Sequence, residues 1–359
     1  MIVCFNLVHI RHLQGRDDEA HAYIQMAVEA RPDHPLTYQS LSWIQEILGY
    51  RDDAMASLRR SISLYRGYEP ERGVAHQRLA NFLASSGRVE EAIEHYRHAL
   101  SCRPADRVSL ERLGRLLLRL GRSTEAIEMY LEWIGVDAAN ATAHYNLGVV
   151  YQQLGRLREA EASYRKAVRL APGDGNKRNN LAVLLMMIGR PSEAIAQFEA
   201  AVKLAPDDPG ARLNLGLALA RFGRRERAMV EFCRALELQP DMVVALRTLS
   251  RLLATGQEAS AHELQQAIDY AERACALTDR MDPVCLDILA IALAADGRFD
   301  RAVEVATRAA ELASASGQAD LATRIRRRIE TYKQLENQPD STNEEIPVSK
   351  IPNLSGTKE

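Results

Sequence analysis

Asparagine recurs in the chain at a regular interval, and its side chain is suited to binding polypeptide. Asn146, Asn180 and Asn214 follow one another at steps of 34 residues, and Asn6 occupies an equivalent position near the start. A side-chain amide both donates and accepts hydrogen bonds, so it can pair with peptide N–H and C=O groups whatever side chains the peptide carries. Two interpretations stay open: these are peptide-binding residues, or asparagine is the ordinary background residue of a repeat.

Arginines form the second candidate binding group. Arg78, Arg112, Arg115 and Arg119, with Asn81 among them, precede the regularly spaced asparagines. Guanidinium groups pair well with carboxylate or phosphate oxygens, because their donors form a planar fork. The few acids expected on the same face are Glu46, Glu111 and Asp287. We therefore expect a positively charged groove that binds other proteins through extended, acidic segments, although the whole chain has a formal net charge of −2.

No catalytic or cofactor-binding motif is present in the sequence. The phosphate loop GxxxxGK[ST], the GxSxG elbow and the HExxH zinc motif are all absent. Two HxxH pairs, His9 with His12 and His95 with His98, each place two imidazoles on one helical face. Metal sites need three or four ligands, and neither pair has a third ligand at helical spacing. We predict no enzyme activity, no catalytic residues, no metal and no cofactor.

The elements that must position these side chains are set by an internal repeat. The phrases "SGRVEEA", "LGRSTEA", "LGRLREA" and "IGRPSEA" recur along the chain. Their glycines and the related ones, most of them 34 residues apart, are Gly15, Gly49, Gly87, Gly121, Gly155, Gly189, Gly223 and Gly297. A fixed period of this size indicates one supersecondary unit that is copied and stacked.

Residues 141–174 show the unit in full. Apolar and small residues recur there at helical spacing, until Gly155 ends the first helix and Pro172 ends the second. Gly148 and Ala160 allow the two helices to approach closely. Each unit is therefore expected to be a helical hairpin.

This pattern resembles the tetratricopeptide repeat family, whose markers appear here as Leu147, Gly148, Tyr151, Ala160, Tyr164 and Pro172. The resemblance implies an all-α fold, a right-handed superhelical α-solenoid. We expect about nine hairpins, at residues 1–34, 35–72, 73–106, 107–140, 141–174, 175–208, 209–242, 243–282 and 283–316. A capping helix at 317–336 and a disordered tail at 337–359 should complete the chain.

The asparagine ladder is similar to the concave lining of the tetratricopeptide arm in O-linked N-acetylglucosamine transferases. That resemblance implies that the concave groove holds an extended polypeptide by its backbone. The leading interpretation is a non-catalytic protein–protein interaction scaffold. The alternative is the recruitment arm of a larger enzyme of the protein glycosyltransferase type.

The expected capping helix has one apolar stripe. The basic residues expected largely outside that stripe are Arg324, Arg326, Arg327, Arg328 and Lys333. A solvated face is the favoured interpretation of these residues, over an acidic membrane surface or nucleic acid.

Composition limits the remaining possibilities. The near-neutral charge argues against nucleic-acid binding, and no apolar run is long enough to span a membrane. The five cysteines include no CxxC motif, so we interpret them as packing residues of a protein in a reducing compartment, the cytoplasm. Residue 1 already occupies the first position of a repeat, with no N-cap residue before it, so we expect the gene to continue upstream.

Overall fold

The fold is known from a computed structural model, which describes residues 10–11, 14–67, 69–256 and 259–336. Within these ranges the chain forms the α-helices α2 to α19 and no strand. The predicted all-α repeat fold is confirmed. Asn6, His9, His12 and the predicted tail at 337–359 lie outside the described residues.

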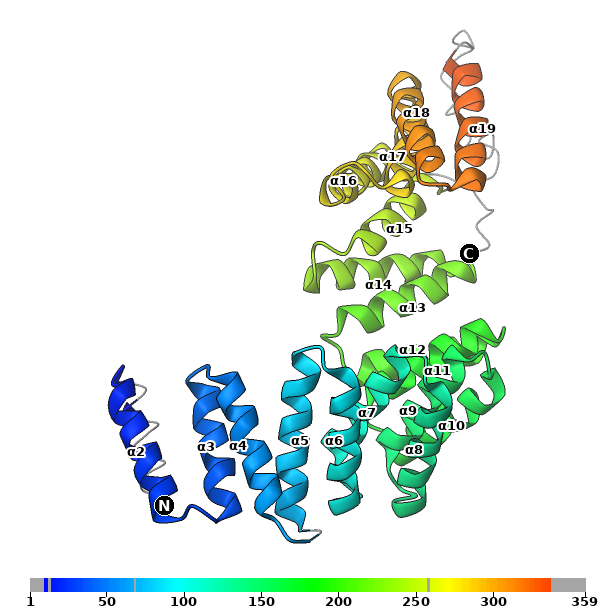
Figure 1. The fold of residues 1–359 in the computed structure, drawn as a ribbon. Helices are drawn as coiled ribbons and strands as arrows, with labels where there is room; N and C mark the ends of the chain where they lie inside the picture. The colour runs from blue at the N-terminus through cyan, green and yellow to red at the C-terminus, as the bar shows by residue number, and fades with distance from the viewer. Residues whose placement is uncertain (1–9, 12–13, 68, 257–258, 337–359) are drawn as a thin grey trace. The chain divides into compact units, whose positions relative to one another are not determined.

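The chain divides into two compact units, Met1–Pro172 and Gly173–Glu359. In each unit, short turns join consecutive helices that lie side by side (Figure 1). The helices of the first unit are α2 (Asp17–Ala30), α3 (Pro35–Ile47), α4 (Arg51–Leu64), α5 (Pro70–Ser85), α6 (Val89–Cys102), α7 (Arg107–Arg119), α8 (Ser123–Val136), α9 (Ala141–Gln153) and α10 (Leu157–Leu170). Those of the second unit are α11 (Gly175–Met187), α12 (Pro191–Leu204), α13 (Pro209–Arg221), α14 (Arg225–Leu238), α15 (Val243–Ala254), α16 (Ala261–Leu277), α17 (Pro283–Ala295), α18 (Phe299–Ala315) and α19 (Ala319–Glu336).

The hairpin α9–α10 shows why these sequences fold as they do. Gly155 turns the chain with a φ of 71°, a left-handed conformation that glycine adopts without steric cost. Gly148 lies against the ring of Tyr164, so closely that a Cβ atom on Gly148 would stand 2.7 Å from the ring. Tyr164 is 1% exposed. The small residue on one helix and the aromatic residue on the other therefore define how the two helices pack.

The first helices of several repeats begin with a capping side chain. Asp106 accepts a hydrogen bond from the backbone N–H of Ser109, and Asn140 accepts from those of Thr142 and Ala143. The equivalent caps in the second unit are Asp174, Asp208 and Asp282. Each cap satisfies backbone donors that have no partner within the helix.

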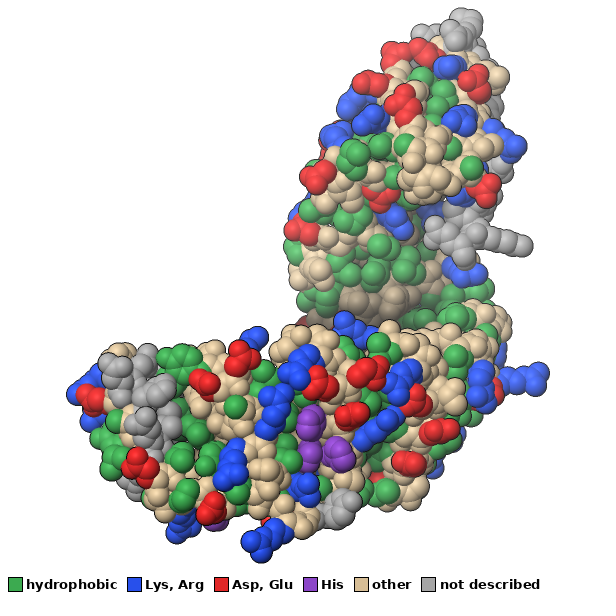
Figure 2. Space-filling model, viewed as in Figure 1, with side chains coloured by type: hydrophobic (Ala, Val, Ile, Leu, Met, Phe, Trp, Pro, Cys, Tyr) green, Lys and Arg blue, Asp and Glu red, His purple; other side chains and the backbone are tan. Residues whose placement is uncertain are grey.

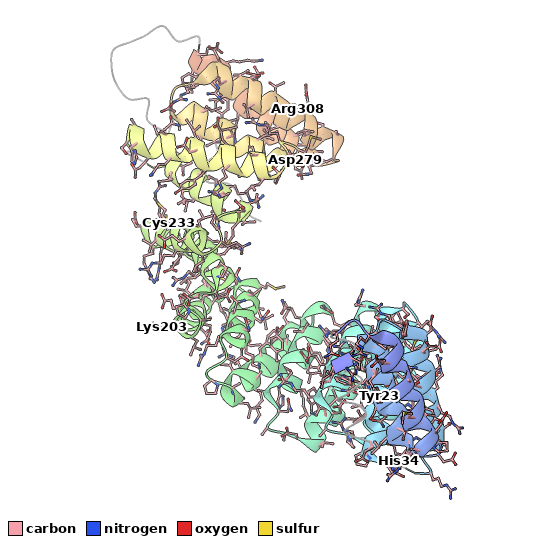
Figure 3. The ribbon with its side chains drawn as sticks, turned by 90° about the vertical axis from the view of Figure 1, so that its left-hand side faces the viewer. Tyr23, His34, Lys203, Cys233, Asp279 and Arg308 are labelled. Carbon is pink, nitrogen blue, oxygen red and sulfur yellow. The ribbon has the colours of Figure 1, made fainter. Side chains whose placement is uncertain are left out.

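The turn between α15 and α16 departs from the common pattern. Ser260 and Glu263 form a capping box that starts α16. At the far end of α16, Asp279 and Arg280 both have positive φ angles, 49° and 56°, in the loop that leads to α17 (Figure 3). The longer spacing in the sequence at this repeat thus corresponds to differently built turns.

The predicted solvated face of the last helix is wrong at one residue. Arg328 is 8% exposed, and its Nη1 atom pairs with both carboxylate oxygens of Asp287 on α17. Residue 328 lies three residues after Ile325 and four before Tyr332, both of which are fully buried. Helical spacing therefore places Arg328 within the buried stripe of α19, and Asp287 is buried rather than facing a groove.

Candidate functional site

The described groove residues of the first unit lie on α5, α7 and α9. Arg112, Arg115 and Arg119 of α7 are spaced three and four residues apart, so they share one helical face. All three are exposed. Arg115 Nη2 lies 3.9 Å from the Glu111 carboxylate. Within the described ranges, Arg112 and Arg119 form no ion pair, so α7 presents a row of arginines with little charge compensation.

Arg78 on α5 has a different environment. Its Nη2 atom lies 2.9 Å from Glu46 Oε2, and its Nη1 atom donates to the backbone oxygen of Gln39 at 3.0 Å. Arg78 and Glu46 line a cavity of about 220 Å³ together with Asn81. The guanidinium group of Arg78 therefore joins α5 to α3 and is less available to a partner than those of α7.

Asn81 is joined to the α7 arginines through a tyrosine. The hydroxyl of Tyr96 on α6 donates to Asn81 Oδ1 at 2.7 Å. Burial raises the pKa of Tyr96, and the nearby Arg112 and Arg115 oppose that rise. Tyr96 thus connects the polar residues of α5 with those of α7.

The three described asparagines have three different hydrogen-bonding environments. Asn146 in the first unit has a buried Nδ2 atom that lacks a hydrogen-bond partner in the described part of the chain. In the second unit, Asn180 Nδ2 donates to the backbone oxygen of Asn176 at 2.9 Å, and Asn214 Nδ2 donates to Asn179 Oδ1 at 3.0 Å. Equal spacing in the sequence did not predict these differences.

A cluster of three histidines was only partly predicted. His76 on α5 joins His95 and His98 of α6, with ring centroids 5.0 to 6.4 Å apart, and histidine side chains gather at one place on the surface of the first unit (Figure 2). The Nδ1 atoms of His76 and His95 lie 2.8 Å apart. Burial, followed by the neighbouring imidazoles, lowers the pKa of His76 to about 3. No three ligating side chains in the described residues are arranged to hold a metal ion.

A cavity of about 420 Å³ between α6, α7 and α8 was not predicted from the sequence. Trp133 on α8 lines this cavity. The equivalent residues of neighbouring repeats are small: Ala99, Ala167, Ala201 and Ala235. This single exception to the small-residue pattern was a signal that could have located the cavity.

Two of the cysteines are packing residues as predicted, and one is not. Burial raises the pKa of Cys275 to about 11 and that of Cys285 to about 12. Cys233 on α14 is exposed instead (Figure 3). Among the described helices, none combines the length and the apolar character that crossing a membrane requires.

Comparison with known proteins identifies the repeats. Family models described as tetratricopeptide repeat match residues 74–106, 111–175, 179–243 and 283–308, together more than half of the chain. No curated protein matches.

The solved structures of PilW and PilF show the same fold. PilW, a type IV pilus biogenesis factor, is 22% identical, with 60% of this chain and 96% of PilW covered and a TM-score of 0.51. PilF of Pseudomonas aeruginosa is 20% identical, with 58% and 93% covered and a TM-score of 0.50. YrrB, a tetratricopeptide repeat protein with an unusual peptide-binding site, is 26% identical, with 49% and 91% covered and a TM-score of 0.40. On the matched repeats and their observed helical hairpins, the chain belongs to the tetratricopeptide repeat family.

Proposed function

We propose that this chain is a non-catalytic scaffold whose first unit binds an extended, acidic segment of another protein. The observation that carries the proposal is the row of exposed arginines on α7, in which Arg112 and Arg119 form no ion pair within the described residues. Guanidinium groups that are exposed and have no carboxylate partner of their own can pair with the carboxylates of another protein.

The contribution of each arginine should follow its present environment. Arg115 is 64% exposed at its side chain and has a long contact of 3.9 Å with Glu111, so little is lost when it turns to a partner. Arg78 is 21% exposed at its side chain and is held by Glu46 and Gln39. We therefore assign the main electrostatic role to α7 and a supporting role to Arg78.

The asparagines supply backbone recognition in this proposal. Asn146 supports it because its buried amide nitrogen has no hydrogen-bond partner among the described residues. A rotation of this side chain toward the groove would let the nitrogen donate to a peptide carbonyl. In the second unit, taken by itself, Asn180 and Asn214 can also bind extended backbone, with a smaller contribution because both have internal partners. Cytoplasmic location, and the alternative of a recruitment arm for a glycosyltransferase, stay predictions.

The test compares two charge-reversed variants. Arg112→Glu/Arg115→Glu/Arg119→Glu changes the α7 row. The control, Arg158→Glu/Arg324→Glu/Arg327→Glu, makes the same change in net charge at three exposed arginines on other helices. Binding of a labelled, unstructured peptide rich in glutamate and serine is measured by fluorescence anisotropy, beside a lysine–serine peptide of equal length.

The parent and the control should bind the glutamate peptide alike, and the α7 variant should bind it at least about tenfold more weakly, a loss of about 1.4 kcal/mol. Binding to the parent should weaken steeply as salt is raised, because exposed charges are screened. Equal binding by all three proteins, or equal binding of both peptides by the parent, would show that the arginine row is not the site.

A further inference from the structure

The cavity between α6, α7 and α8 is separate from the arginine row. Its floor consists of buried apolar side chains of α7 and α8, among them Leu113, Leu117 and Trp133, each at most 2% exposed. Its wall on α6 includes Leu100, and Val136 at the end of α8 is 62% exposed at its edge. A volume of about 420 Å³ lies within the range of pockets that bind ligands.

Trp133 explains why the cavity occurs in this repeat. In the neighbouring repeats the equivalent residues are Ala99 and Ala167, each at most 1% exposed. In repeat 107–140 an indole occupies that position and packs beside Tyr130, with ring centroids 6.5 Å apart. We attribute the cavity to this indole, because a large, rigid side chain in place of a methyl group requires the surrounding helices to shift.

The rim of the cavity is acidic. Glu125 is neutralised by Arg122, at 2.6 Å, and by Arg97, which reaches it from α6. Glu128 and Glu132 are exposed and form no ion pair within the part of the chain that the structure describes. They are four residues apart on α8, so they stand about 5–6 Å from each other on the same side of the helix. Two uncompensated carboxylates thus flank an apolar cavity.

We propose that this cavity is a second docking site, for a basic amphipathic helix of a partner protein. A large apolar side chain of the partner fills the space beside Trp133, and lysine or arginine side chains one helical turn away pair with Glu128 and Glu132. This partner is basic, whereas the partner proposed for the α7 arginines is acidic. The chain can therefore hold two partners, or two segments of one partner, at sites that differ in both charge and shape.

Trp133 also provides a local signal for the test. The only other tryptophan is Trp43, so Trp43→Phe leaves Trp133 as the sole indole fluorophore. In this background we compare the parent, Glu128→Lys/Glu132→Lys, and the control Glu237→Lys/Glu304→Lys. The control changes the net charge equally at two exposed acids on α14 and α18. The probe is a helical peptide with leucines on one face and lysines beside them.

Two further peptides test the two parts of the proposal, one with the lysines replaced by glutamate and one with the leucines replaced by alanine. In the parent and the control, the first peptide should bind and shift the Trp133 emission. The rim variant should bind it at least about tenfold more weakly, and both altered peptides should lose binding to a similar extent. Circular dichroism verifies that the rim variant is folded, as expected for changes at exposed residues.

Several results would overturn this proposal. These are equal affinity of the rim variant and the control, binding that leaves the Trp133 emission unchanged, or no binding of the leucine–lysine peptide to the parent. Self-association of the parent that the rim substitutions abolish would assign the cavity to a second copy of the chain instead. The α7 charge-reversed variant should bind this peptide as the parent does, so this test and that of the arginine row can fail independently.

Discussion

The buried ion pair between Arg328 and Asp287 joins the last helix, α19, to α17. Replacing Arg328 by methionine leaves a carboxylate that is 5% exposed without its cation. Replacing Asp287 by leucine leaves a buried guanidinium group in the same way. Removing one partner of a buried pair typically costs about 3–5 kcal/mol, so each single variant should lose that amount of local stability at α17 to α19.

The double variant Asp287→Leu/Arg328→Met should recover most of this loss. Apolar side chains of similar volume often replace a buried ion pair with no net cost, because neither charge then has to be removed from water. The coupling energy between the two positions is therefore expected to be at least about 3 kcal/mol, as measured by the double-mutant cycle.

Amide hydrogen exchange of α17 to α19, measured by mass spectrometry, is the suitable assay, because repeat arrays can open locally without unfolding as a whole. Exchange of α3 and α4 in the first unit serves as an internal control and should not change. Single variants that each lose less than about 1 kcal/mol, or a double variant whose loss is the sum of both, would refute the reasoning.

Three further predictions concern the rest of the chain. Because the pKa of His76 is lowered to about 3, the unfolded state binds a proton at this residue more readily than the folded state does. The free energy of unfolding of the parent, measured with urea, should therefore decrease as the pH falls below about 6.5, by at most about 1.4 kcal/mol per pH unit from this group. His76→Phe should show a smaller decrease with pH. In thermal unfolding, Gly148→Ala should destabilise the protein by about 1–3 kcal/mol, because the new methyl group collides with Tyr164. Gly135→Ala should instead stabilise the protein by up to about 1 kcal/mol, because Gly135 lies in a helix with open space around the new methyl group. Replacing Asn146, Asn180 and Asn214 by alanine should weaken acidic and neutral extended peptides alike, by about 0.5–1.5 kcal/mol for each hydrogen bond lost; an effect confined to acidic peptides in the anisotropy assay would contradict backbone recognition.

The hairpins could be predicted from the sequence because the residues that define them act locally. Gly155 and Pro172 end helices through their own backbone geometry, and Gly148 meets Tyr164 within the same hairpin. Arg328 was misplaced because residue type was given more weight than helical position, although its spacing from Ile325 and Tyr332 already indicated burial.

The arrangement of the candidate sites was harder to predict, because it depends on contacts between repeats. Arg78 pairs with Glu46, 32 residues earlier, and Asn214 donates to Asn179, 35 residues earlier. Periodicity places such residues on a face but does not state which partner each one meets. The cavity beside Trp133 could be predicted only in part. The tryptophan is visible in the sequence as an exception to the alanine pattern, but the cavity beside it is not.

The glycine turns have a consequence for how such a gene can change over generations. At Gly121, as at the other left-handed glycines that follow first helices, a Cβ atom would have no neighbour within 4 Å. The glycine position itself therefore meets nothing that depends on which repeats flank it. Recombination between two such turns would add or remove one whole repeat while leaving the joint itself unaltered. New binding surface can then be acquired by copying a hairpin first and diversifying its exposed side chains afterwards, as the arginines of one repeat and the asparagines of others illustrate.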